Sequence, residues 1–258
     1  MLLNCHTHYS FHYGLFSVEE LINEVQQKGY SRFVLTDINN TSACLETVRQ
    51  LQEKNIVPAI GIDFRNGIQC CYIGIARNNE GFRELNEHLT FHLHNDEKFV
   101  SIAPDFNHAF VIYPFVNYSG FKLRANEFVG VSPQDLTKLP FSKYKSLTKK
   151  MVILQPVTFA HKIHFNAHRL LRAIDKNTVL SKLELHEQTS PNEILPPKNE
   201  LYALFIQYPE IIANTEFILD SCSIDFNYGK MSNKNLAHFT DSFANDILLL
   251  RKESYDGI

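Results

Sequence analysis

The sequence lacks a surplus of basic side chains, because its 25 lysines and arginines are outnumbered by 28 aspartates and glutamates in 258 residues. The formal net charge is −3. A domain that grips duplex phosphates by itself normally carries a basic surplus, so the composition argues against general nucleic-acid binding. The densest basic run, from Lys143 to Lys150, is typical of a solvated loop.

Further absences narrow the class of protein. The five cysteines show no CxxC spacing, which fits reduced thiols in a cytoplasmic protein. No apolar run approaches the length of a membrane span, and no signal peptide precedes the first predicted strand. There is no Gly-rich phosphate loop and no clustered Asp-x-Asp pair for nucleotidyl transfer. We therefore expect a soluble, cytoplasmic protein with no membrane contact and no polymerase core.

The sequence does have enough apolar material for a sizeable core, because hydrophobic residues make up 44% of it. Its first third alternates short apolar strands, at 2–5, 33–35 and 56–62, with helices. The first helix opens at Ser17, which forms a capping box with Glu20. Strand, helix, strand, helix, strand at this spacing predicts parallel βα units.

After the third strand the pattern loosens. A turn at 65–67 predicts that the next strand, at 68–76, pairs back on the third one. Further strands are expected at 110–113, 127–131 and 151–160, and helices at 80–94, 167–174, 199–207, 210–222 and 241–253. No internal repeat, low-complexity tract or linker interrupts the chain, so one compact domain is the simplest interpretation.

Three consecutive predicted strands end in a possible metal ligand. His6 and His8 follow the first strand, Asp37 the second and Asp63 the third. In a parallel βα barrel all strand C-termini open on one face, where active sites are built. Imidazole and carboxylate together suit zinc or manganese better than calcium. The sequence therefore predicts a metal site there, although each residue taken singly is as easily a turn or cap residue.

The segments at these strand ends resemble the first three motifs of the PHP family, which is named for polymerases and histidinol phosphatases. They are His6-Thr7-His8-Tyr9-Ser10, Leu35-Thr36-Asp37 and Gly61-Ile62-Asp63-Phe64. Residues 72–82, 207–215 and 250–257 are similar to segments of the N-terminal PHP domain of bacterial DNA polymerase III alpha subunits. The resemblance covers essentially the whole chain.

This resemblance implies an α/β fold, namely a distorted (βα)7 TIM-like barrel of the PHP type with extra helices at the C-terminal end. It implies a single PHP domain over residues 1–258, with the barrel at about 1–235 and a helix at 236–258 that leads toward a polymerase core. It also implies a part in DNA replication. The implied partners are that core and a proofreading exonuclease subunit, with DNA reached only through the parent polymerase.

In the family, up to three divalent metals serve phosphoester hydrolysis. The resemblance assigns five ligands in this chain: His6, His8, Asp37, Asp63 and His164. Four positions where the family has an acid or a histidine carry other side chains: Tyr13, Ile38, Cys71 and Lys162. Five ligands cannot fill three metals, so we expect at most one zinc or manganese ion and assign no catalytic residue.

Lys162 replaces the acid of a late Asp-x-His pair of the family and suggests a specific physical role. An ammonium among the acids and histidines would supply the positive charge of a metal and would repel a metal ion. We therefore expect Lys162 to lie within ion-pair reach of Asp37 or Asp63. The alternative is that Lys162 points into solvent.

Functions from different classes remain open. The first is a structural and interaction domain of a replicative polymerase, with a degenerate metal site and no phosphoesterase activity. The alternative is a metal-dependent phosphoesterase, either a phosphatase or a 3′–5′ exonuclease. A weaker third option is a simple metal-binding module. Because hydrolysis at a multi-metal site needs metals to hold phosphate and activate water, the number of intact ligands separates the first two.

Overall fold

The computed structural model describes residues 2–228 and 238–257. The chain divides into two compact units, Met1–Phe226 and Asn227–Ile258, and each is described by itself. Among the described residues, the larger unit holds every strand and the helices α1 to α6, and the smaller unit holds α7. Whether residues 1–258 act as a single domain stays a prediction.

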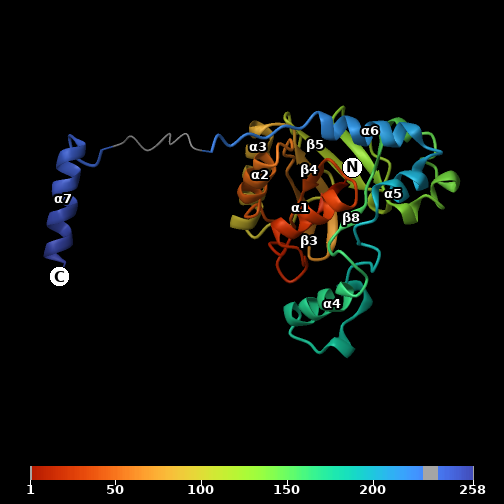
Figure 1. The fold of residues 1–258 in the computed structure, drawn as a ribbon, viewed down its shortest axis with the longest axis horizontal. Helices are drawn as coiled ribbons and strands as arrows, with labels where there is room; N and C mark the ends of the chain where they lie inside the picture. The colour runs from red at the N-terminus through yellow and green to blue at the C-terminus, as the bar shows by residue number, and fades with distance from the viewer. Residues whose placement is uncertain (1, 229–237, 258) are drawn as a thin grey trace. The chain divides into compact units, whose positions relative to one another are not determined.

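The strands of the larger unit form two sheets (Figure 1). A three-stranded parallel sheet has the order β2 (Phe33–Leu35), β1 (Leu2–Cys5), β8 (Pro156–Val157). A five-stranded sheet has the order β3 (Gly61–Asn66), β4 (Gln69–Ala76), β5 (Ala109–Pro114), β6 (Glu127–Val131), β7 (Met151–Ile153). In the second sheet β4 runs antiparallel to both neighbours, which confirms the predicted hairpin. The predicted bounds of the third strand, 56–62, are wrong: β3 spans Gly61–Asn66, so Asp63 lies within the strand and not at its end.

Isolated parallel bridges join the two sheets, between Leu35 and Ile60 and between Ile38 and Asp63. The ends of β2 and β3 are thereby neighbours. The mixed α/β class is confirmed. A closed seven-unit barrel is not confirmed, because β7 and β8 are end strands of different sheets among the strands that the structure describes. The strand predicted at 151–160 is in fact these two strands, and β8 begins at Pro156, which has no N–H to give to a ladder.

The helices lie close to their predicted positions. They are α1 (Val18–Gln27), α2 (Cys44–Glu53), α3 (Asn79–His94), α4 (His164–Asp175), α5 (Lys198–Phe205), α6 (Pro209–Asp220) and α7 (Phe243–Asp256). Short 3-10 turns lie at Phe115–Asn117, Pro133–Asp135, Leu139–Phe141, Thr148–Lys150, Leu180–Lys182 and Leu185–Glu187. The capping box of Ser17 and Glu20 is confirmed. In the described part of the chain, none of these helices combines the length and apolarity needed to cross a bilayer.

The five-stranded sheet is buried on both faces. Along β4, Tyr72 joins one apolar cluster and Ile73 the other, and along β5 the same alternation separates Val111 from Ile112. This is the period of two that a strand imposes on its side chains. In Figure 1, α4 and the turns after it stand out from the part of the larger unit that holds the strands.

Candidate functional site at the strand ends

The carboxylate of Asp37, at the end of β2, binds the turn that follows β1. Its Oδ1 accepts the Thr7 backbone N–H at 2.6 Å and the Ser10 hydroxyl at 2.7 Å, and its Oδ2 accepts the Thr7 hydroxyl at 2.7 Å. Asp37, Thr7 and Ser10 are all fully buried. Both carboxylate oxygens of Asp37 thus accept hydrogen bonds from neutral donors of one turn. Asp37 therefore acts as a residue that holds this turn.

Gly14 closes the same turn. A Cβ at this position would lie 2.0 Å from the Thr7 carbonyl oxygen, so only glycine allows the chain to pass there. This close approach places the preceding residue, Tyr13, over the strand ends.

His6, directly after β1, is in contact with Asp63, which lies within β3. The distance from His6 Nε2 to Asp63 Oδ2 is 3.1 Å, and the other ring nitrogen, Nδ1, lies 3.0 Å from the Thr158 hydroxyl. None of the three side chains is exposed. Two of the predicted ligands are therefore in contact, but each nitrogen of the imidazole already has a protein partner.

Arg65 is the main partner of Asp63, and the sequence prediction missed it. Its guanidinium donates to Asp63 Oδ2 from Nε at 2.9 Å and from Nη2 at 2.6 Å. Only 5% of Arg65 is exposed. Burial alone would raise the pKa of Asp63, but the Arg65 charge and the His6 hydrogen bond hold that pKa well below its usual range. The carboxylate is therefore ionised and paired with Arg65 at neutral pH.

The second oxygen of Asp63, Oδ1, is buried and accepts no hydrogen bond from the residues that the structure describes. Burial first, and then the negative charge of Asp63, raises the pKa of the nearby Cys70 thiol well above its usual value. The thiol is thus neutral. Cys71, the residue predicted to stand in for a histidine, instead accepts a hydrogen bond from the Asn66 amide at 3.3 Å.

A line of hydrogen bonds runs from Asp63 through His6 and Thr158 to Glu193, which also accepts from Thr189 and from the Tyr13 hydroxyl. The line thus joins the carboxylates of Asp63 and Glu193 through one imidazole and one hydroxyl, and it occupies both ring nitrogens of His6.

Glu193 is a second residue that the sequence prediction missed. Its backbone carbonyl accepts the Thr158 N–H at 2.9 Å, and the next residue, Ile194, bridges to Phe159. This pairing brings a loop from far along the chain to β8. Glu193 thus brings a carboxylate from another loop beside Tyr13, Thr158 and Thr189.

Tyr13 packs among these groups. Its ring centroid lies 4.8 Å from the Arg65 guanidinium carbon and 5.6 Å from the His6 ring. The Nδ1–H of His168, on α4, donates a hydrogen bond to the Tyr13 carbonyl oxygen at 2.9 Å, because a carbonyl oxygen can only accept. Burial raises the pKa of the Tyr13 phenol. Tyr13 is therefore a neutral packing residue.

The remaining predicted ligands lie apart from this cluster. His8 and His164 are exposed. Hydrogen bonds from Ser17 lower the pKa of Glu20 on α1, and the charges of His8 and His164 add to that shift, so both histidines lie on the α1 side. His164 lines a cavity of about 440 Å³ there, together with Glu20.

The expectation for Lys162 is wrong. Lys162 precedes α4, is exposed, and forms no ion pair with any residue in the ranges 2–228 and 238–257. Its ammonium is not beside Asp37 or Asp63, because α4 begins at His164 and extends the chain away from the strand ends. Ile38 is half-buried, and its N–H donates to the Ser10 hydroxyl at 3.0 Å.

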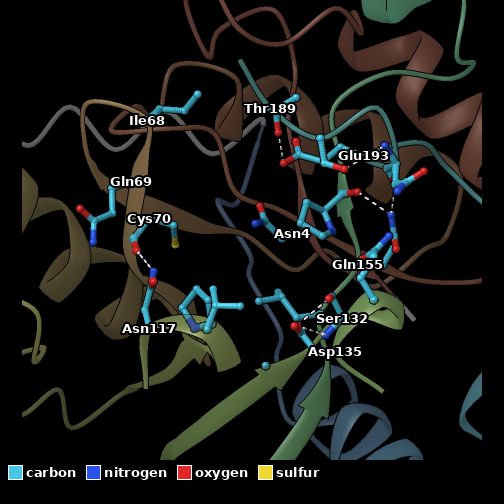
Figure 2. A pocket seen from close by; sticks show the side chains of 18 of the residues that line it. Asn4, Ile68, Gln69, Cys70, Asn117, Ser132, Asp135, Gln155, Thr189 and Glu193 are labelled. Atoms are coloured by element: carbon cyan, nitrogen blue, oxygen red, sulfur yellow. Dashed lines mark hydrogen bonds between the residues drawn. The ribbon is translucent and has the colours of Figure 1, made fainter. Parts of the chain in front are cut away.

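A cavity of about 530 Å³ opens over Arg65 and Tyr13. Figure 2 shows Asn4, Gln155, Thr189 and Glu193 on one side of it, and Gln69, Cys70 and Asn117 on the other. Most of the polar groups are carboxamides and hydroxyls, which can both donate and accept hydrogen bonds.

The donor set does not fit the metal site that the family implies. No group of three or more His, Cys, Asp or Glu side chains that could hold a metal ion is found among the described residues. His6 and Asp37 have their donor atoms engaged, and Asp63 has Arg65 against it. One free oxygen, Asp63 Oδ1, is not a coordination sphere. Metal binding stays a prediction.

Comparisons with known proteins bear on the family. The sequence model of the PHP domain matches residues 3–119, the segment that contains β1 to β5. A protein named DNA polymerase III subunit alpha, from Ureaplasma parvum serovar 3, is 30% identical over 83 residues, which are 32% of this chain. The match covers 8% of that relative's length. Residues 3–119 of this chain are therefore similar to the PHP domain family.

Proposed function

We propose that these residues are the N-terminal PHP domain of a DNA polymerase III alpha subunit and serve DNA replication as a structural and interaction domain. The observation that supports this most is the set of partners around the predicted ligands. Asp37 is bound by the Thr7–Ser10 turn, and Asp63 is bound by Arg65 and His6. The motifs of a metal site remain, but their side chains hold the fold together.

The same partners argue against phosphoester hydrolysis. A hydrolase of this type needs metal ions to bind the phosphate and to lower the pKa of an attacking water. The Arg65 guanidinium, which is paired with Asp63, has no lone pair for a metal ion and cannot lower the pKa of a water as a metal does. The alternative, a metal-dependent 3′–5′ exonuclease or phosphatase, has in its favour the cavity over Arg65, which is large enough for a nucleotide.

The wider assembly is part of the proposal. The downstream polymerase core of the same chain is the first partner, and a proofreading exonuclease subunit is the second. DNA is reached through the parent polymerase, in the cytoplasm. The strands complete a distorted PHP-type barrel in this arrangement, and the helix within 236–258 leads toward the core.

Hydrolysis is the direct test. We expect the purified chain to release no nucleotide from single-stranded DNA 3′ ends and no phosphate from a phosphomonoester above background, with Mn²⁺ or Zn²⁺ added. His6→Ala serves as the matched control and is expected to give the same background. Metal-dependent turnover that His6→Ala abolishes would overturn the structural role and establish the phosphoesterase.

A further inference from the structure

We propose that the Arg65 guanidinium is the resident cation of this site and stands in for the divalent ion, so that the domain folds without metal. This inference deepens the structural role proposed above and rests on it. The sequence led us to expect that Lys162 replaces the metal. We instead assign this role to Arg65, which lies two positions after Asp63 on the same strand.

The geometry of β3 places the Arg65 side chain beside that of Asp63. Residues two apart on a strand point to the same face, so on β3 a side chain at 65 lies beside the carboxylate at 63. Two nitrogens of the fork reach one oxygen, at 2.6 and 2.9 Å, and the Tyr13 ring covers the guanidinium at 4.8 Å. Three contacts from two elements therefore hold Arg65 in one place.

The charge of Asp63 is also already balanced by protein side chains. The buried carboxylate of Asp63 needs a cation, and His6 and Arg65 are the groups in contact with it that can carry positive charge. A divalent ion on Asp63 Oδ1 would lie within a few ångströms of the guanidinium, at low local dielectric, where like charges repel strongly. Arginine keeps its proton at all ordinary pH values, so this cation cannot be lost.

A double-mutant cycle tests the pairing. Arg65→Met removes the charge at similar length and leaves Asp63 buried and uncompensated, so we expect the melting temperature to fall by about 10 °C. Asp63→Asn in the same chain should restore part of that loss, because no buried charge then remains unpaired. Should Arg65→Met fail to fold, a folded double variant still supports the pairing. The matched control is Arg49→Met, which removes exposed ion pairs on α2 and should shift melting by about 2 °C at most.

A metal titration tests the substitution itself. Arg65→Ala opens the space beside Asp63, so we expect added Mn²⁺ or Zn²⁺ to raise the melting temperature of this variant and to bind in calorimetry, whereas wild type responds to neither metal nor chelator. Wild-type protein that is stabilised by metal, an Arg65→Ala variant that ignores it, or an additive double-mutant cycle would each overturn the inference. Hydrolysis assays fail or succeed independently of these melting curves, so an error in the proposed function is recognised separately.

Discussion

Asp37 lies just after β2 and Asp63 lies within β3, and the backbone N–H of Asp63 donates to the Asp37 carbonyl at 3.2 Å. Both carboxylates are fully buried. Yet Asp37 is surrounded by neutral N–H and O–H donors of a single turn, whereas Asp63 contacts the Arg65 guanidinium and the His6 imidazole, besides one neutral donor, the Asn4 amide at 3.3 Å. The fold thus satisfies one carboxylate by hydrogen bonds and the other by charge.

Under the structural role that we propose, this difference separates two ways of accommodating a buried carboxylate. Asp37 is satisfied by donors of one turn, so its removal should affect that turn alone. Asp63 is paired with a cation, the Arg65 guanidinium, which lies on the same strand. The two aspartates should therefore respond differently to substitution.

The largest expected effect is that of Asp63→Ala. This change leaves the Arg65 guanidinium buried beside His6 without its carboxylate, so the free energy of unfolding should fall by about 3–5 kcal/mol. Urea unfolding followed by circular dichroism measures it. A loss comparable to that of an exposed ion pair, about 1 kcal/mol or less, would mean that the pair is not structurally required.

A smaller effect is expected for Asp37→Asn, because the amide oxygen can still accept from the Thr7 N–H and the Ser10 hydroxyl. The loss of charge-assisted hydrogen bonds should cost about 1–2 kcal/mol. This loss should be additive with that of Arg65→Met, since Asp37 has no contact with the guanidinium in the described hydrogen bonds. Strong coupling between the two variants would show that the carboxylates form one site.

The pH dependence separates the Asp63 pair from another titratable group, the half-buried His88 of α3. Burial lowers the pKa of His88 to about 4. The unfolded chain therefore binds a proton that the folded one does not, and stability falls as the pH drops from the ordinary histidine value to about 4. His88→Gln should flatten this part of the profile, by roughly 1 kcal/mol after allowance for the partial exposure of the ring.

Asp63 acts at more acid pH. Its pKa is lower in the folded protein, so the pair contributes fully above the ordinary aspartate value and is lost as the pH falls below that value toward the folded one. Denaturant melts at a series of pH values resolve the two ranges. If His88→Gln leaves the profile above pH 4 unchanged, the assignment to His88 is wrong.

The smallest effect is expected for Lys162→Met. Because the ammonium is exposed and has no described ion pair, the free energy of unfolding should change by about 0.5 kcal/mol or less. A loss similar to that of Asp63→Ala would restore Lys162 as the cation of the site.

Much of the fold could be predicted because its signals are local. The capping box at Ser17, the βα rhythm and the hairpin after β3 each follow from a few adjacent residues. The contact between His6 and Asp63 could be predicted as well, since strand ends meet on one face.

The partners of the site were harder to predict for different reasons. Arg65 was missed because the sequence prediction placed it in a turn at 65–67, whereas β3 extends to Asn66 and puts Arg65 on the same face as Asp63. Glu193 had no local signal, because a loop pairing distant in sequence brings it to Thr158. His164 was misplaced because α4 begins at that residue, earlier than the apolar spacing from 167 suggested.

The metal content of the purified chain tests the central account most directly. After dialysis against Zn²⁺ and Mn²⁺ and removal of free ions, mass spectrometry of the wild-type protein should find no stoichiometric metal, because Arg65 already neutralises Asp63. One tightly held ion per chain that is lost in His6→Ala would contradict the account and show that the strand-end residues are metal ligands.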